Sequence, residues 1–327
     1  MNKYLKIVSL NFIVLIFILI LLEILARIAI YIIRDSSTVG IHERNLNLDY
    51  EPYVMFGNNW ENQFDNIKPK QKFRIVLLGG STGQGFNIKI LEKKIKDKIN
   101  IETEVFNAAA GAYNIRQQLV LLSIWGNRLD PDIVISFDGA NDILHSLRGE
   151  HEKGTFFLNH TYKAYLTKPY LGSFIYLIQN SQLYNGLIRF SRRYQAFNEK
   201  DHYKNIDIYL EAKENISLIS NAYDAYHISI LQPYLGFKKE KSDREKAFTF
   251  YDYRDEIVKK LFLYTDKKLK INADKFKNTF YFNSQNLYNT NKTIFSDDLH
   301  FIDDFGYEIL SNKISEIILK NKLYIKK

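Results

Sequence analysis

The chain has 327 residues, no cysteine and a formal net charge of +8, and 46% of its residues are hydrophobic. This length and composition are typical of one large α/β domain, or two small ones, with a real core. The absence of cysteine excludes disulfides, thiolate metal sites and cysteine nucleophiles. The positive charge is mostly lysine spread along the sequence, without a dense basic cluster or a nucleic-acid motif, so we expect no nucleic-acid partner.

Residues 1–33 form the first predicted element, a helical membrane anchor. Residues 7–33 are apolar, interrupted only by Ser9, Asn11, Glu23 and Arg27. About 20 apolar residues span a bilayer as a helix, and we place the span at about residues 7–28. A signal peptide is the competing interpretation, but no A-x-A cleavage site follows, so we expect an uncleaved anchor. Because Lys3 and Lys6 precede the span, the positive-inside rule favours a single-pass protein of the cytoplasmic membrane with an extracytoplasmic body, periplasmic or at the cell surface.

The rest of the chain divides into a predicted tether and entry segment, residues 34–72, and a predicted α/β domain, residues 73–327. Within that domain, the continuous apolar runs of buried strands alternate with amphipathic helical patterns. The predicted strands are residues 74–78, 104–107, 132–137, 227–231 and 279–282. The predicted helices are residues 88–99, 115–128, 212–225 and 243–270, with one more near the C-terminus. This alternation predicts a three-layer α/β/α fold with a doubly wound, mainly parallel sheet.

Residues 145–210 interrupt the alternation. They are rich in tyrosine and carry few buried-strand patterns, and residues 171–190 have a possible amphipathic helical pattern. We therefore expect a helical insertion or cap here.

The sequence IVLLGGSTGQG, residues 75–85, ends the first buried strand in glycines, and three known motifs compete for it. A phosphate-binding loop, G-x-x-x-x-G-K-[ST], needs a lysine where Phe86 stands. A dinucleotide-binding loop needs G-x-G-x-x-G, which no frame of this stretch provides. Gly79-x-Ser81-x-Gly83 matches the nucleophile elbow of α/β-hydrolases. That elbow normally follows several earlier strands, however, whereas Ser81 follows the first strand of the domain.

A serine at a strand end can still be a nucleophile if other strand ends supply its partners, and candidates are present. Gly111 follows the second predicted strand, Asn141 follows the third, and Asp297 and His300 precede the last helix. In a doubly wound sheet the loops at the carboxyl ends of the strands converge on one crevice, so residues distant in sequence can meet. Together the blocks LLGGST, AAAGAYN, DGAND and DDLHFIDDFGY resemble the four blocks of the SGNH hydrolase superfamily, the GDSL-type esterases and lipases, over roughly residues 73–320.

This resemblance implies the flavodoxin-like SGNH fold for residues 73–327, with roles for five residues of the site. Ser81 is the implied nucleophile, His300 the base, and Asp297 the carboxylate that orients the base. The backbone N–H groups of Ser81 and Gly111 and the side-chain amide of Asn141 form the implied oxyanion hole.

Gly80 departs from the family pattern, whose first block often reads G-D-S. The family's aspartate at that place is outside its triad, so we expect the chemistry to be unaffected and the local hydrogen bonding to differ.

The residue types suit this chemistry independently of the resemblance. A serine hydroxyl is a poor nucleophile until a base takes its proton, and a histidine oriented by a carboxylate does so near neutral pH. Glycine lets a backbone N–H approach the substrate, and asparagine offers an amide donor that cannot act as a competing base.

Taken singly, each candidate also has a structural interpretation. Ser81 or Thr82 can cap a helix, Asn141 can form a turn, and Asp297 can cap the C-terminal helix. A lone histidine such as His300 is more often structural than catalytic. The joint occurrence of the four blocks, in order and at predicted strand ends, favours the enzymatic site.

We therefore expect a serine esterase that acts on acyl esters through an acyl-serine intermediate. The resemblance to anchored members of the family implies O-acyl groups, O-acetyl above all, on cell-envelope or exported carbohydrate. An O-acyltransferase that uses the same triad on a polysaccharide is an open alternative, as is a non-catalytic envelope protein that keeps the fold for binding or assembly. A lipase is also possible. We expect no cofactor and no metal, because no histidine or carboxylate spacing typical of metal ligands is present.

Overall fold

The computed structural model describes residues 3–37, 49–51, 53–65, 67–148, 199–248 and 252–325, together with residues 170, 181, 183 and 184. The chain forms two compact units. The first comprises Met1–His42 and Leu158–Phe197, and the second comprises Glu43–Phe157 and Asn198–Lys327. Apart from the four single residues, the predicted insertion between residues 148 and 199, including its helix at residues 171–190, lies outside the described residues.

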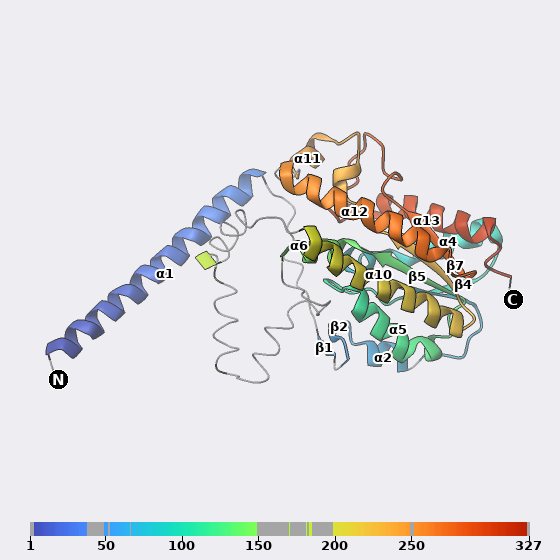
Figure 1. The fold of residues 1–327 in the computed structure, drawn as a ribbon, viewed down its shortest axis with the longest axis horizontal. Coiled ribbons are helices and arrows are strands. Elements are labelled where there is room, and N and C mark those ends of the chain that lie inside the picture. The colour runs from blue at the N-terminus through green and yellow to red at the C-terminus, as the bar shows by residue number, and fades with distance from the viewer. Residues whose placement is uncertain are drawn as a thin grey trace. The chain divides into compact units, whose positions relative to one another are not determined.

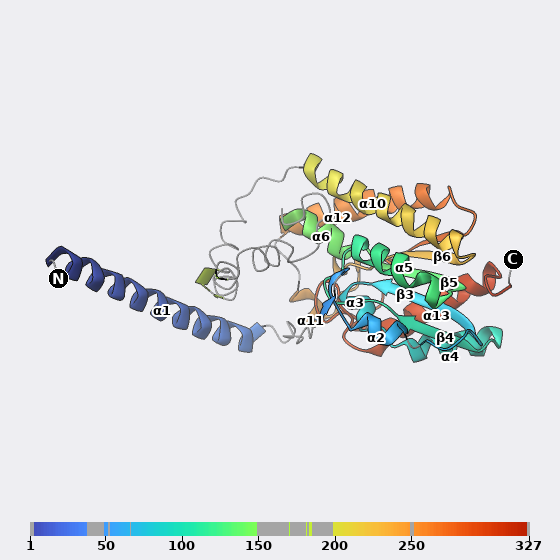
Figure 2. The same ribbon diagram turned by 90° about the horizontal axis from the view of Figure 1, so that it is seen from below.

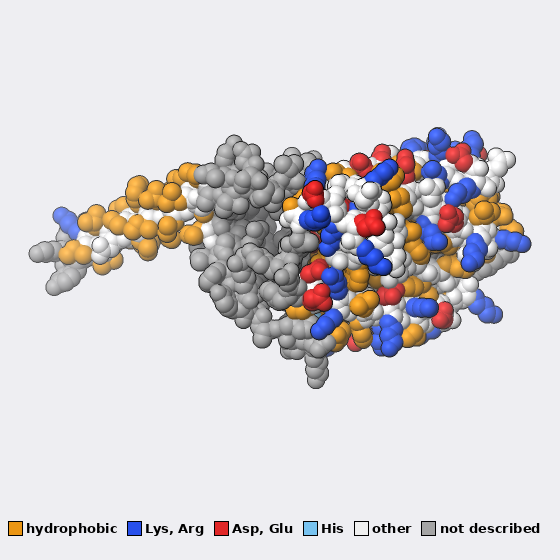
Figure 3. Space-filling model, turned by 90° about the horizontal axis from the view of Figure 1, so that it is seen from above, with side chains coloured by type: hydrophobic (Ala, Val, Ile, Leu, Met, Phe, Trp, Pro, Cys, Tyr) orange, Lys and Arg blue, Asp and Glu red, His pale blue; other side chains and the backbone are white. Residues whose placement is uncertain are grey.

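The first unit contains helix α1, Lys3–Ser37 (Figure 1). Its part Lys6–Ile28 is long and apolar enough to cross a membrane, a property that signal sequences near an N-terminus share. Hydrophobic side chains are exposed along this part of the helix (Figure 3). The carboxylate of Glu23 accepts hydrogen bonds from Arg27 Nε at 2.9 Å, Ser181 Oγ at 2.7 Å and the Leu183 N–H at 3.0 Å. The charge in the apolar helix is therefore paired.

The second unit is built on a five-stranded sheet in the order β4-β3-β5-β6-β7, in which all neighbouring strands are parallel. The strands are β3 (Phe73–Gly79), β4 (Thr103–Asn107), β5 (Ile133–Asp138), β6 (Tyr226–Leu231) and β7 (Thr279–Asn283). The chain passes from β3 to β4 on one side and then to β5 on the other, which creates a topological switch point at β3. Open α/β sheets bind ligands at the carboxyl ends of the strands beside such a point. The predicted doubly wound parallel sheet is confirmed.

Helices cover both faces of this sheet (Figure 2). On one face, α4 (Ile88–Ile99) packs against α13 (Asp304–Lys320). On the other, α5 (Ile115–Leu129) packs against α10 (Glu199–Ala222), which begins well before the start predicted at residue 212. Helix α12 (Asp252–Ala273) lies beside α10 and β7. This is the predicted three-layer arrangement.

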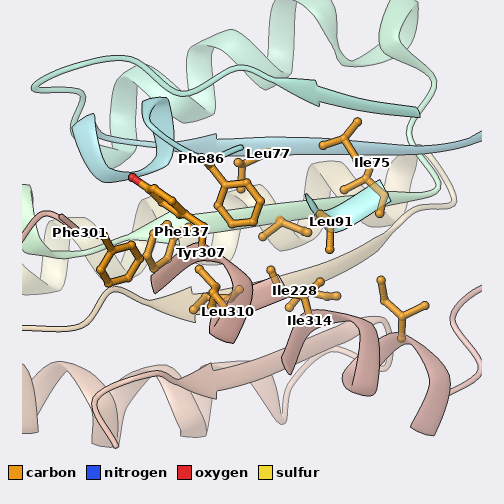
Figure 4. Packing of buried hydrophobic residues seen from close by; sticks show 14 of the residues in the cluster. Ile75, Leu77, Phe86, Leu91, Phe137, Ile228, Phe301, Tyr307, Leu310 and Ile314 are labelled. Carbon is orange, nitrogen blue, oxygen red and sulfur yellow. The ribbon is translucent and has the colours of Figure 1, made fainter. Parts of the chain in front are cut away.

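The apolar residues of the strands and helices meet in a buried core. Between the sheet and α13, Ile75 and Leu77 of β3 face Leu310 and Ile314 of α13, and all four side chains have 0% exposure (Figure 4). The alternate residues of β3 are also fully buried, because helices cover the opposite face as well. Burial on both faces explains the continuous apolar run in the sequence.

On the face of the molecule shown in Figure 3, Lys and Arg side chains are interspersed with Asp and Glu. The positive net charge is therefore not gathered into a single patch on this face.

The single helix predicted at residues 243–270 is wrong. The structure has a short helix α11 (Asp243–Lys246) and then α12. Ser242 and Glu245 form a capping box at the start of α11. The side chain of Glu245 is fully buried and accepts the backbone N–H groups of Ile294 and Phe295 at 2.9 and 3.1 Å. The short helix thus holds the loop that leads to His300, a contact that helical periodicity does not reveal.

Within the predicted tether and entry segment, the structure describes a hairpin and a short helix. Strands β1 (Asp49–Glu51) and β2 (Met55–Gly57) pair as an antiparallel hairpin, and α2 (Trp60–Asp65) follows. Trp60 is fully buried, stacks on Phe64 with ring centroids 5.3 Å apart, and donates from Nε1 to the Tyr113 hydroxyl at 2.8 Å. The segment therefore packs against the loop that follows β4.

Replacing Trp60 by alanine should lower the free energy of unfolding by about 3–5 kcal/mol, because a fully buried aromatic side chain is lost and a cavity remains. Urea denaturation of the full-length protein measures this change. Tyr53→Ala is the matched control, since the Tyr53 side chain is 60% exposed. Equal stability of the two variants would contradict the packing role of Trp60.

Candidate active site

Three loops leave the sheet at the carboxyl ends of neighbouring parallel strands. Ser81 follows β3, Gly111 follows β4 and Asn141 follows β5. A fourth segment, residues 295–301, precedes α13 and brings His300 to the same edge, where its imidazole lies against Ser81. The convergence expected from the sheet topology is therefore observed for Ser81 and His300, whose sequence positions lie 219 residues apart.

The side chains of Ser81, His300 and Asp297 form a continuous hydrogen-bonded relay. Ser81 Oγ lies 2.6 Å from His300 Nε2, and His300 Nδ1 lies 2.7 Å from Asp297 Oδ2. With the proton on Nδ1 donated to the carboxylate, Nε2 is left as an acceptor for the serine hydroxyl. A relay of this geometry can withdraw the serine proton when Ser81 attacks a carbonyl carbon.

Asp297 shapes the loop that carries the histidine. Its Oδ1 accepts the backbone N–H groups of Leu299 and His300 at 2.8 and 2.7 Å, while Oδ2 faces the imidazole. Burial acts to raise the pKa of Asp297, but the hydrogen bond and charge of His300 and the two backbone N–H groups outweigh it, so the pKa is lowered. The carboxylate is therefore ionised at neutral pH, where it fixes the tautomer of the imidazole.

Ser81 does not cap a helix. It is the first residue of the short helix α3 (Ser81–Gln84), whose N-cap is Gly80 and has no side-chain hydrogen bond. A Cβ on Gly80 would lie 2.5 Å from Asn141 Nδ2. Glycine at this position thus lets the loop after β5 approach the serine. The C-terminal helix is capped by Asp303, which accepts the N–H of Phe305 at 3.0 Å, so Asp297 is not its cap.

Asn141 is tied to the loop that contains Gly111. Its Nδ2 donates to the Tyr113 carbonyl at 2.9 Å. Gly111 lies buried in the turn closed by the hydrogen bond from the Tyr113 N–H to the Ala110 carbonyl at 3.2 Å. An amide has two N–H donors, so the bond to Tyr113 leaves Nδ2 a second one beside the serine loop. The geometry thus brings the candidate donors of two loops to the same edge of the sheet.

A buried polar network lies behind the loop of Asn141. The ammonium of Lys213 donates to both oxygens of Asp138 at 2.8 and 2.9 Å and to Ser136 Oγ at 2.6 Å. Ser136 Oγ lies 2.7 Å from His227 Nε2, and His227 Nδ1 lies 2.8 Å from Ser217 Oγ. Ser217 Oγ donates its only proton to the Lys213 carbonyl at 3.3 Å, so it accepts from His227 Nδ1, and Nε2 of the neutral imidazole accepts the Ser136 proton.

The charges in this network follow from burial. Burial, together with the positive charge of Lys213, lowers the pKa of His227 well below its usual value, so this imidazole is neutral. Burial also lowers the pKa of Lys213, while Asp138 acts in the opposite direction. The pair is retained as an ion pair at 2.8 Å with both side chains 3% exposed. Removing one partner of such a pair leaves the other buried and uncompensated.

Asp142, which follows Asn141, contacts the start of helix α5. Its two carboxylate oxygens lie 3.3 Å from the N–H of Ile115, the first residue of α5. Burial, and next the negative charge of Asp138, raises the pKa of Asp142 to about 8. The side chain is therefore protonated over much of the neutral range.

The sequence prediction missed the ion pair of Lys213 and Asp138 behind the site. Asp138 lies at a strand end, so the rule that located Asn141 could also have placed it at this edge. Lys213 had no comparable pattern, because its partner is reached only through the packing of α10 on the sheet. Among the described residues, no group of three or more His, Asp or Glu side chains is arranged to hold a metal ion.

No family model and no curated protein matches the chain in sequence. Similar solved structures include a lipase from a goat rumen metagenome, with 12% identity, a TM-score of 0.47, and coverage of 74% of this chain and 95% of that one. Another is a catalytic mutant of an acetylxylan esterase from Geobacillus stearothermophilus, with 11% identity, a TM-score of 0.47, and coverage of 76% of this chain and 94% of that one.

The raised pKa of Asp142 predicts a pH dependence of stability. In the unfolded chain this carboxyl ionises near roughly pH 4, whereas the folded chain keeps the proton up to about pH 8. The unfolded state thus releases its proton first, and the free energy of unfolding should fall as the pH rises through this window. Asp142→Asn keeps the acceptor oxygen and removes the titration. Urea denaturation should therefore show the variant gaining stability over the parent as the pH rises, and parallel pH profiles would contradict the assignment.

Proposed function

We propose that this chain is a serine esterase of the SGNH hydrolase superfamily that cleaves acyl esters through an acyl-serine intermediate. The observation that carries the proposal is the relay of Ser81, His300 and Asp297, with hydrogen bonds of 2.6 and 2.7 Å. The resemblance of the four sequence blocks to those of the superfamily supports it. The reaction consists of acyl transfer and proton transfer only, and these side chains account for every proton that moves.

In the first half of the reaction, Ser81 Oγ attacks the carbonyl carbon of the ester while His300 Nε2 takes the hydroxyl proton. The tetrahedral intermediate collapses when the bond to the alkoxy oxygen breaks, and His300 returns the proton to that oxygen. In the second half, His300 removes a proton from water, the resulting hydroxide attacks the acyl-serine, and the acid leaves as Ser81 regains its proton. Asp297 stabilises the imidazolium that forms in each half.

The negative charge that develops on the carbonyl oxygen requires preorganised donors. We assign this role to the N–H groups of Ser81 and Gly111 and to the Asn141 amide. The hydrogen bond from Asn141 Nδ2 to the Tyr113 carbonyl supports the assignment, because it fixes the amide plane before substrate binds. Fixed donors need no reorganisation during the reaction, which is why such sites contribute strongly to catalysis.

The finer parts of the proposal concern substrate and location. We propose O-acetyl esters of cell-envelope or exported carbohydrate as substrates, on the basis of the resemblance to anchored members of the family. The apolar helix α1 supports a membrane attachment, and Lys3 and Lys6 at its start favour a body outside the cytoplasm.

The deciding experiment follows p-nitrophenyl acetate turnover by the full-length protein in detergent. Ser81→Ala should abolish turnover and labelling by a fluorophosphonate, because both need the same Oγ. Ser123→Ala is the matched control, since Ser123 Oγ only donates to the Leu119 carbonyl on the surface of α5. Inert parent protein with intact folding would overturn the esterase assignment. A stoichiometric burst without turnover would instead indicate transfer to an acceptor that the assay lacks.

Asn141→Ala should lower kcat by about 100- to 1000-fold with a smaller effect on KM, because one donor to the developing oxyanion is lost. Thermal unfolding measured beside the kinetics separates this effect from the loss of the bond to Tyr113. A kcat within a factor of about two of the parent would remove Asn141 from the oxyanion hole, since even a single donor is worth far more than that.

A further inference from the structure

Two residues next to the proposed catalytic pair are joined by a buried side chain from a third element. Thr82 follows Ser81, and Leu299 precedes His300. Gln232 directly follows β6, and its Nε2 donates to Thr82 Oγ1 at 2.7 Å and lies 3.5 Å from the Leu299 carbonyl. The Thr82 hydroxyl in turn donates to that same carbonyl at 3.3 Å.

The direction of these hydrogen bonds is fixed by the chemistry of the groups. The Leu299 carbonyl can only accept, so the single proton of the Thr82 hydroxyl is used toward it. The hydroxyl oxygen then accepts from Gln232, which must present its amide nitrogen rather than its oxygen. A glutamine satisfies this requirement at every pH, and an ionised carboxylate cannot.

Thr82 and Gln232 are both buried, and hydrogen bonds hold their backbones to neighbouring elements. Thr82 is 1% exposed and Gln232 is 4% exposed. The backbone N–H of Gln232 donates to the Asp138 carbonyl at 2.8 Å, which extends the pairing of β6 with β5. On the opposite side, the Tyr307 hydroxyl from α13 donates to the Thr82 carbonyl at 2.9 Å (Figure 4 shows this ring in the core).

We infer that Gln232 is a positioning residue that holds the loop of Ser81 and the loop of His300 in register through the Thr82 hydroxyl. The inference rests on the proposed function for its catalytic meaning. No covalent bond links the two loops, and the 2.6 Å contact between Ser81 Oγ and His300 Nε2 needs their backbones to keep a fixed separation. A displacement of about 1 Å in such a contact can cost about 100-fold in rate.

The first test uses kinetics of the full-length protein. Gln232→Met keeps the side-chain volume and removes the donor, and kcat should fall about 10- to 100-fold while KM stays nearly constant. Thr82→Val should give the same loss, whereas Thr82→Ser keeps the hydroxyl and should have the kcat of the parent. The double variant Gln232→Met with Thr82→Val should be no slower than either single variant. Additive losses, or an unchanged kcat in Gln232→Met, would overturn the inference.

A matched control separates positioning from general destabilisation. Thr265 is a second buried threonine, and its hydroxyl donates to the Leu261 carbonyl at 2.8 Å within α12. Thr265→Val should lower the melting temperature and leave kcat unchanged. An equal loss of kcat in this variant would show that deletion of any buried hydroxyl has the same effect, and would overturn the inference.

Gln232→Glu supplies a readout that packing alone would not move. The introduced carboxyl can donate to Thr82 only when protonated, and burial would raise its pKa. The kcat of this variant relative to the parent should therefore fall as the pH rises, and Gln232→Met should show a constant ratio. A pH-independent ratio for Gln232→Glu would contradict the required direction of the hydrogen bond, even if Gln232→Met fails to fold.

A spectroscopic arm keeps the inference distinct from the proposed function. In protein labelled at histidine, the proton on His300 Nδ1, assigned with His300→Gln, reports the geometry of the relay by NMR. Gln232→Met should shift or broaden this signal and Thr265→Val should not. If the parent neither turns over esters nor reacts with fluorophosphonate, the proposed function fails. An unchanged His300 signal in Gln232→Met would then overturn the positioning role separately.

Discussion

Because β3 pairs in parallel with both β4 and β5, the loops that follow these three strands must leave the sheet at one edge. That backbone constraint brings Ser81, Gly111 and Asn141 together without any of them being close in sequence. The remaining requirement is a histidine from the far end of the chain, which the loop before α13 provides. The site is thus assembled on rigid strand ends. The position of His300 depends on side-chain hydrogen bonds that fix the loop before α13. Precision in such a site comes from supports behind the reacting groups.

The polar side chains of the network around Lys213 are costly to bury, and each of them is paired within it. Lys213 neutralises Asp138, and the neutral His227 completes a chain of donors and acceptors that returns to the backbone of α10 through Ser217. A partly satisfied network would be worse than an apolar core. Its completeness defines one conformation for the end of β5, from which Gly139 turns with φ of +105° toward Asn141.

The sequence predicted the elements whose patterns are local. The apolar run of β3 and the amphipathic pattern of α4 were located nearly to the residue, since burial on two faces or on one face dictates them. Ser81 and His300 were named together by the resemblance of the four blocks, and the structure places their side chains 2.6 Å apart. Long-range side-chain partnerships were not foreseen: the buried carboxylate of Glu245 binds backbone some 50 residues away, and this residue belongs to the separate short helix α11, where a single helix was predicted at 243–270. Gln232 was likewise missed, as a single polar residue after a strand has no distinctive spacing.

The close approach of Gly80 to Asn141 has a consequence for how this sequence can change. A Cβ at position 80 would lie 2.5 Å from Asn141 Nδ2, and the hydrogen bond to the Tyr113 carbonyl keeps that amide from swinging aside. Any side chain introduced there, an aspartate included, therefore requires the loop following β5 to move. Tolerance of a side chain at position 80 thus depends on the loop after β5, and substitutions in that loop decide whether such a change keeps the site.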